Sequence, residues 1–505
     1  MLNCTKQRNE KFSYSTLMIF LLSSVVLIMA GCGSSDSSDN KVGYLKFYNS
    51  STNAPSLFLT VDENLDEDED DEVEITFSGT AYGTADTRRE LPTGDYFYEL
   101  AWQDEDSAAR ADLEMIFQDQ ISIEQDTIKF VVASGDISQP QVNVYDISLV
   151  DDEDDSTLSL FNLRVLNMHG SNQALDIYLS QTDETFNEAT MIGSYSFQEL
   201  SENQKFDQDQ YVFYITHAGE DEVLFQSNNV SFLYPSQYVM VIRENIGNSD
   251  SPYIIDKVSS SYTETFLDYN AEAHFRVFNA IDQHELIADY NDAIDVEITG
   301  GNTTSSLSSL ERGTFSDEIV KENGDFSVKV TVSDSETILL NNHLLSLPEN
   351  ANKTLFLYLT EDNVDHDGDG DVDENGDGIV DEIEISINSL VVDNSVRESI
   401  YDHQLQLVNL VDSDDFGVVE FYFVRSDETI ATAYYSSAVS YANAESIILR
   451  NNTYQVFAVA KHNSSEIVLA NFELTLDENS DELFLIIEQD DTAASGYRVT
   501  TEEQL

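Results

Sequence analysis

Beyond residue 40 the chain alternates hydrophobic and polar residues over short stretches that are separated by turn residues. Clear examples are Val73–Phe77, Phe326–Val332, Thr354–Leu359 and Glu382–Ile387. A period of two places alternate side chains on one buried face, which is the signature of a half-buried β-strand. Long stretches with helical period are scarce, and the chain has 6 prolines with abundant Tyr and Phe. The pattern predicts an all-β protein.

The strand pattern also repeats along the chain. Four segments open with a strand that ends in Asn, namely Leu45–Asn49, Leu163–Asn167, Phe275–Asn279 and Leu405–Asn409. An aromatic strand follows in phase, beginning at Asp95, Gln210, Asp325 and Thr453, and an apolar strand closes each unit at Ile128–Val132, Tyr238–Ile242, Leu355–Leu359 and Leu483–Ile487. Chance similarity among strands is the alternative, and the shared phase argues against it. We therefore expect a tandem array of about four immunoglobulin-like or transthyretin-like β-sandwich domains.

The repeat predicts where the units begin and end. The expected sandwiches span residues 43–158, 159–270, 271–398 and 399–505, and the third carries an acidic insertion at 362–384. The acidic run Asp151–Asp155 falls close to the first boundary. Like charges there would extend a linker.

The first 31 residues have the features of a secretory signal peptide. Lys6, Arg8 and Lys11 form a basic region, and an apolar run from Leu17 to Met29 follows. This run is too short to span a bilayer comfortably as a helix. It ends in small residues directly before Cys32, and residues 32–42 read as a flexible tether.

The string Leu27–Cys32 resembles the lipobox of bacterial lipoproteins, with Met29 in the position usually held by Leu. The resemblance implies cleavage before Cys32, lipidation of its thiol and amine, and stable membrane anchoring. Gly33 in place of Asp resembles the sorting pattern for the outer membrane of Gram-negative bacteria. An ordinary signal peptide or a signal anchor is the alternative.

Charge and cysteine content narrow the partners and the chemistry. The net charge of −73 argues against nucleic acid or an anionic membrane surface as a partner, since both would repel the chain. The 25 Tyr and 27 Phe argue against disorder. Because Cys4 would leave with the signal peptide and Cys32 would be acylated, we expect no disulfide.

The segment Leu163–Leu179 resembles the opening of bacterial modules known as domain of unknown function 4397. Its second strand, Leu175-Asp176-Ile177-Tyr178, carries the resemblance. In the other units Ser56–Leu59, Ala288–Asp289 and Glu420–Phe423 take that place with looser matches. The resemblance implies a sandwich fold on exported proteins and brings no known chemistry.

The acidic insertion fits the spacing of an EF-hand-type calcium loop. Its ligand positions 1, 3, 5, 7, 9 and 12 are Asp373, Asn375, Asp377, Ile379 (through its carbonyl), Asp381 and Glu384. Gly378 supplies the turn. Ca²⁺ requires six to eight hard oxygens, which such spacing provides.

An overlapping register with Asp365, Asp367, Asp369 and Asp371 resembles thrombospondin type 3 repeats and gives a candidate second ion. Because the flanks read as strands, we expect a structural clasp rather than a sensor. A solvated acidic loop without an ion is the alternative. Asp62–Glu74 lacks this spacing and reads as a solvated hairpin tip.

No motif for catalysis stands out in the chain. The 8 histidines are scattered without metal-ligand spacing, and GxSxG, P-loop and GxGxxG patterns are missing from the sequence. Trp102 reads as a core residue. The sequence therefore predicts a non-enzymatic envelope lipoprotein that binds an unidentified protein or glycan or acts as a spacer, with surface adhesion as its expected use. An exported carboxylate-dependent hydrolase, for example one acting on polysaccharide, is the alternative.

Overall fold

The computed structural model describes residues 41–65, 72–150, 159–171, 173–301, 303–365, 372–373, 380–413, 415–490 and 492–504. Over these residues the strands form eight sheets that pair into four sandwiches, each around its own apolar core. We name them module 1 (β1–β8), module 2 (β9–β19), module 3 (β20–β27) and module 4 (β28–β35). The predicted all-β tandem sandwich array is confirmed.

The elements of module 1 are β1 Val42–Ser50, β2 Leu57–Asp62, β3 Glu74–Thr76, β4 Arg89–Pro92, β5 Gly94–Gln103, η1 Arg110–Asp112, β6 Leu113–Ile123, β7 Thr127–Ser134 and β8 Gln141–Ser148. Those of module 2 are β9 Leu160–Asn167, β10 Leu175–Gln181, η3 Phe186–Glu188, β11 Thr190–Tyr195, β12 Glu199–Leu200, β13 Gln204–Asp207, β14 Gln210–His217, β15 Phe225–Gln226, β16 Val230–Ser231, β17 Gln237–Glu244, β18 Tyr253–Val258 and β19 Thr263–Phe266.

Module 3 contains β20 Ala273–Ala280, β21 Ala293–Gly300, β22 Thr303–Glu311, β23 Ile319–Lys321, β24 Gly324–Val332, β25 Ile338–Leu347, β26 Asn352–Asn363 and β27 Ile383–Asp393. Module 4 contains β28 Asp402–Asn409, β29 Val418–Val424, η4 Ile430–Thr432, β30 Tyr435–Ser440, β31 Asn443–Arg450, β32 Asn452–His462, β33 Ser465–Leu476, β34 Leu483–Gln489 and β35 Tyr497–Glu503. Across the described residues no helix is both long and apolar enough to cross a bilayer.

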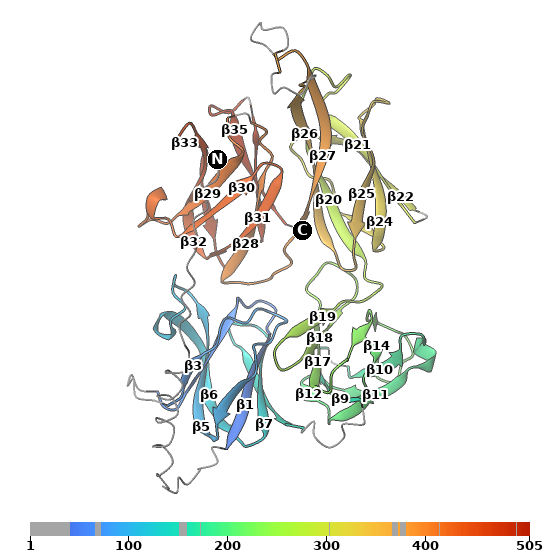
Figure 1. The fold of residues 1–505 in the computed structure, drawn as a ribbon, viewed down its shortest axis with the longest axis vertical. Helices are drawn as coiled ribbons and strands as arrows, with labels where there is room; N and C mark the ends of the chain where they lie inside the picture. The colour runs from blue at the N-terminus through green and yellow to red at the C-terminus, as the bar shows by residue number, and fades with distance from the viewer. Residues whose placement is uncertain are drawn as a thin grey trace, which may run out of the picture. The chain divides into compact units, whose positions relative to one another are not determined.

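The four modules share one topology. In each, the strand that opens the module pairs in parallel with a late strand of the same sheet, as β1 does with β7, β9 with β17, β20 with β26 and β28 with β34. We call this sheet the opening sheet and the other layer the partner sheet. Figure 1 shows the two layers of module 3, with β20, β26 and β27 in one and β21, β22, β24 and β25 in the other.

Two details of the sequence prediction are wrong. The apolar strand does not close each unit, because β8, β18, β27 and β35 follow it and pair antiparallel with it. In module 3 Ala288–Asp289 does not lie in the second strand. Asp289 has a φ of 62°, outside the β region, and β21 begins only at Ala293.

The Asn that ends each opening strand ties the two layers together. Asn409 is fully buried, and its Nδ2 donates to the Val439 carbonyl of the partner sheet at 3.0 Å. Its Oδ1 accepts the Val411 amide at 3.0 Å, which closes a turn after the strand. The same pair of contacts is made by buried Asn49 (Thr80, Ser51), Asn167 (Tyr195, His169) and Asn279 (Leu310, Ile281). The repeat read from the sequence is therefore a repeat of structure.

The backbone around this Asn repeats as well. Its carbonyl accepts an amide from a residue with positive φ in every module, namely Gly83, Gln198, Gly313 and Ala442. The aromatic strand contributes a second recurring contact in three modules. There Tyr96, Tyr211 and Tyr454 each donate a hydroxyl hydrogen bond to the carbonyl four residues earlier. Module 3 has Phe326 at this position and lacks the bond.

The opening sheets are buried on both faces because they stack in pairs. The outer faces of the opening sheets of modules 1 and 2 share an apolar cluster that includes Tyr48, Phe130, Val132, Leu166 and Val241. We call this contact the first interface. A matching second interface joins modules 3 and 4 through Phe278, Phe356, Val408, Phe484 and Ile486. Each pair of modules is thus joined by an additional apolar core, separate from the cores inside the sandwiches.

Trp102 lies in the core of module 1 with 8% of its surface exposed, as predicted. Its ring stacks on Tyr401 at a centroid distance of 4.3 Å and an interplanar angle of 7°. Tyr401 directly precedes β28. The indole therefore fixes the start of module 4 against module 1, a role that its position in the sequence did not indicate.

We predict that Asn409→Ala destabilises module 4. The substitution leaves the Val439 carbonyl and the Val411 amide buried without their partner, which costs roughly 2–4 kcal/mol. Urea unfolding of the full chain, followed by circular dichroism, is expected to show an early transition for this module. Asn471→Ala, at an exposed position of β33, is the control. Equal midpoints for the two variants would contradict the role of the Asn.

Candidate functional site

A buried ion pair lies inside the first interface. Arg243 Nε of β17 donates to Asp256 Oδ2 of β18 at 2.6 Å, and their side chains are 8% and 0% exposed. From module 1 the Tyr48 hydroxyl donates to the same oxygen at 2.6 Å. Thr265 Oγ1 donates to the second carboxylate oxygen, Asp256 Oδ1, also at 2.6 Å. Donors from both modules therefore satisfy the hydrogen-bonding capacity of the Asp256 carboxylate in the absence of water.

Tyr82 of module 1 caps this ion pair. The guanidinium of Arg243 lies 4.6 Å from the centroid of the Tyr82 ring, and the Tyr82 hydroxyl donates to the Glu244 carbonyl at 2.8 Å. Burial raises the pKa of Tyr82 to about 12. The phenol therefore stays neutral at ordinary pH and serves as a hydrogen-bond donor. Together these contacts fix modules 1 and 2 in one relative position.

A cavity of about 250 Å³ opens within the same interface. Its apolar wall is formed by residues such as Ile128, Phe130 and Val239. Three cations reach it, Lys46 from β1, Arg88 from the segment before β4 and Arg164 from β9. None of the described residues that line it is Asp or Glu.

Burial changes the pKa values of the cations that line this cavity. Burial lowers the pKa of Lys46 to about 8, although attraction from Asp86 opposes the shift. Burial likewise lowers the pKa of Arg164, with only Glu202 opposing it. Asp86 is itself held away from water, and burial raises its pKa to about 6. The cavity therefore has an excess of positive charge that nearby carboxylates offset incompletely.

In the second interface the cation at the equivalent strand position has different neighbours. Arg276 occupies the position in β20 that Lys46 and Arg164 occupy in β1 and β9, one residue after the first apolar position of the repeat. Its guanidinium lies 4.0 Å from the centroid of the Phe315 ring, and its Nη2 donates to the Glu503 carbonyl. An aromatic ring and a carbonyl thus cover Arg276. The fourth unit has the neutral Gln406 at this position.

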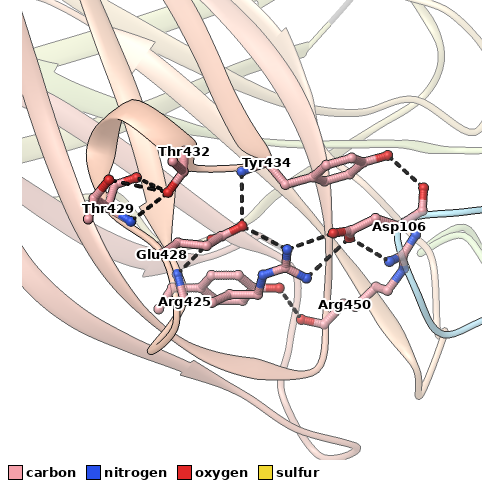
Figure 2. A network of polar contacts seen from close by, with 8 residues as sticks. Asp106, Arg425, Glu428, Thr429, Thr432, Tyr434 and Arg450 are labelled. Atoms are coloured by element: carbon pink, nitrogen blue, oxygen red, sulfur yellow. Dashed lines mark hydrogen bonds and ion pairs between the residues drawn. The ribbon is translucent and has the colours of Figure 1, made fainter.

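A third polar cluster joins module 1 to module 4. Figure 2 shows Asp106 between two guanidinium groups, with Arg425 donating to it at 2.6 and 3.1 Å and Arg450 at 3.2 Å. The Tyr434 hydroxyl donates to the Asp106 carbonyl at 3.0 Å. Arg425 also binds Glu428 at 2.7 Å and thereby holds the pKa of that carboxyl below its usual range. We call this set the Asp106 cluster.

The residues predicted to carry chemistry lie largely outside the part of the chain that the structure describes. This holds for Cys32, for Asn375, Asp377 and Ile379, and for Asp367, Asp369 and Asp371. Asp365, Asp373, Asp381 and Glu384 are described. Within the described ranges no group of three or more His, Cys, Asp or Glu side chains is placed to hold a metal ion.

The strands around the acidic insertion place its two ends together. β26 and β27 pair antiparallel over their full length, up to Asn363 opposite Ile383. Beyond this pair the Val364 amide donates to the Glu382 carbonyl at 3.0 Å, and the Asp381 amide donates to the Val372 carbonyl at 3.1 Å. The insertion therefore leaves and re-enters module 3 at one point, between strands as the sequence predicted.

The sequence analysis did not recognise the cations of the interface cavity. A signal was available, because three of the four opening strands carry a base at the same position, as Lys46, Arg164 and Arg276. On a half-buried strand such a base reads as solvent-facing. Stacking of two opening sheets buries that face, and this packing is not visible in the pattern of a single strand.

No family model matches the chain, and no curated protein matches it. Among solved structures it is similar to the TIE protein of Bacillus anthracis, with 10% identity, 93% of this chain and 77% of that chain covered, and a TM-score of 0.15. It is also similar to the major pilin subunit BcpA of Bacillus cereus (9%, 65% and 99%, TM-score 0.14) and to a putative cell adhesion protein of Parabacteroides distasonis (8%, 69% and 100%, TM-score 0.14). Similarity at this level assigns no function to the chain.

We predict that Asp106→Ala loosens the contact between modules 1 and 4. Arg425 and Arg450 lose their shared acceptor, and because Asp106 is 34% exposed the cost is about 1 kcal/mol. Hydrogen exchange measured by mass spectrometry is expected to be roughly fivefold faster around Tyr434. Asp427→Ala, which removes an exposed carboxylate nearby, is the control. The same acceleration in both variants would assign the effect to charge alone.

Proposed function

We propose that this chain is a non-enzymatic, lipid-anchored envelope protein that presents a rigid array of β-sandwich modules for binding, as in surface adhesion. The observation that supports the proposal best is the first interface. Its apolar cluster is contributed by modules 1 and 2, and Tyr48 of module 1 donates to the Asp256 carboxylate that pairs with Arg243 in module 2. Such an interface holds a surface in a fixed geometry, which lowers the entropic cost of binding a partner.

The anchor is the part of the proposal on which the location of the protein depends. Cys32 lies ten residues before β1, which begins at Val42. Acylation there would attach module 1 to the membrane through a short tether. An outer-membrane position in a Gram-negative envelope follows from the sorting pattern at Gly33.

The anchor can be tested with the two cysteines of the chain. We predict that Cys32→Ser releases the protein from the membrane fraction, whereas Cys4→Ser leaves it anchored. Mass spectrometry of the native protein is expected to find Cys32 at the N-terminus carrying acyl chains. Cells with the Cys32→Ser variant are also expected to attach less to surfaces. A native protein that keeps its leader, or a bare Cys32, would overturn the proposal.

An exported hydrolase is the competing function. It would require two carboxyls in a cleft, spaced for acid–base work on a glycosidic bond. Asp256, the most deeply buried carboxylate of the first interface, is instead occupied by Arg243, Tyr48 and Thr265. Release of reducing ends from polysaccharide by the purified chain would favour the hydrolase.

We also propose that the insertion between β26 and β27 holds a structural Ca²⁺. The support is chemical: oxygen donors at EF-hand spacing, and a hairpin that fixes both ends of the loop. The described residues Asp373, Asp381 and Glu384 would act with Asn375, Asp377 and the carbonyl of Ile379. Asp365, Asp367, Asp369 and Asp371 would supply the second, weaker ion.

Calcium is expected to raise the melting temperature of the full chain in a saturable manner, because an ion that binds only the folded state stabilises it. Glu384→Gln removes the bidentate ligand and is expected to abolish most of the shift. Glu473→Gln, at an exposed position of β33, is the control for charge. Identical melting of the calcium-loaded and chelator-treated protein would instead support a solvated loop without an ion.

A further inference from the structure

The cavity in the first interface reverses the charge balance of the chain. Acidic residues outnumber basic ones by about four to one in the sequence, with 96 against 23. The described lining of the cavity contains Lys46, Arg88 and Arg164 and no carboxylate. In a protein this acidic, three cations around one space require a reason that packing alone does not supply.

The cations of the cavity are held by neutral groups. Lys46 Nζ donates to the carbonyls of Asp86 and Ser260, the latter at 3.4 Å. Arg164 Nη1 donates to the Ser201 carbonyl at 2.8 Å. The guanidinium of Arg88 lies 4.6 Å from the centroid of the Tyr44 ring. Uncharged groups therefore contribute to positioning each of the three side chains.

The carboxylates that face these cations are few. Asp86 attracts Lys46, but its Oδ1 already accepts the Phe47 amide at 2.7 Å. Glu202 lies 4.0 Å from Arg164, and its side chain is fully exposed to solvent. Among the described residues no carboxylate lies within ion-pair distance of Arg88. The three cations around the cavity therefore carry more positive charge than these carboxylates offset.

Two further observations mark the site as different from the rest of the interface. The Nε of Arg164 is buried and has no hydrogen-bond partner, a state that costs free energy unless something fills it. Another buried cation of this interface, Arg243, is matched to the carboxylate of Asp256. The interface thus places a carboxylate beside Arg243 and none in the described lining of this cavity.

We propose that the cavity binds a single-ring organic carboxylate. The anionic group would take hydrogen bonds from Arg88 and Arg164 and the charge of Lys46, and the ring would lie against Ile128, Phe130 and Val239. The size agrees, since a cavity of roughly 150 Å³ holds benzene and this one measures about 250 Å³. Asn203 and Ser236 in the lining can bind hydroxyl groups of a sugar acid.

Two sources share this chemistry, the uronic acid unit of a glycan and an aromatic acid, and calorimetry on the full mature chain can separate them. The probes are D-glucuronate and benzoate, each compared with its neutral counterpart, methyl glucoside and benzyl alcohol, at constant ionic strength. We expect one carboxylate to bind, with its neutral counterpart at least about tenfold weaker. Preference for glucuronate or for benzoate then identifies the source.

Variants locate the binding. Arg88→Gln, at a half-exposed position, is expected to weaken the bound carboxylate about tenfold, and Arg164→Gln at least as much. Lys461→Gln, which removes one exposed charge in module 4, is expected to leave affinity unchanged. Melting curves show whether each variant is folded. If Arg164→Gln does not fold, Arg88→Gln gives the decisive result.

Three outcomes would overturn the proposal: no binding of either carboxylate at millimolar concentration, equally tight binding of inorganic sulfate, or unchanged affinity in Arg88→Gln. The inference goes beyond the proposed function. Its failure would leave the lipid anchor and the adhesive role untouched, because those are read from membrane fractionation and cell attachment.

Discussion

The fold depends on a buried asparagine side chain that connects the two layers of each sandwich. Both polar atoms of this amide bond to the backbone: Oδ1 accepts an N–H of the following turn, and Nδ2 donates to a carbonyl of the partner sheet. The four residues are Asn49, Asn167, Asn279 and Asn409. The amide fixes how the opening strand ends and where the opposite sheet begins. A buried polar group of this kind specifies one arrangement, because few other packings would satisfy it.

Stacking of the opening sheets extends this logic from one module to two. A sheet that is apolar on both faces is unusual in an antiparallel sandwich, where one face normally meets water. Here β20 is buried along its whole length, between the core of module 3 and the second interface. Charged residues on the outer faces are then forced into a dry environment. In the first interface, Asp256, which accepts a hydrogen bond from Tyr48, pairs with the buried charge of Arg243 at one place, and charged side chains line a cavity at another.

The sequence was sufficient for the class of fold and for its repetition. The period of two, the Asn at the end of each opening strand and the aromatic residue of the central strand are local signals, and each has a local contact that explains it. Pairing of modules could not be predicted, since it depends on which solvent-facing residues of distant strands meet. The opening strand of module 3 illustrates this, because Arg276 looks exposed in its pattern but lies beneath Phe315. The lipid anchor and the calcium loop remain predictions from sequence.

Strand direction has a consequence for how the chain travels through its modules. In modules 1, 3 and 4 the first strand runs parallel to the seventh, and the last strand runs back beside it. The polypeptide therefore enters and leaves each of these modules at the same end. Module 2 carries the additional strand β19 after β18, which carries its exit to the opposite end. The two-strand hairpin from Tyr253 to Phe266, formed by β18 and β19, therefore sets the end at which the chain leaves module 2.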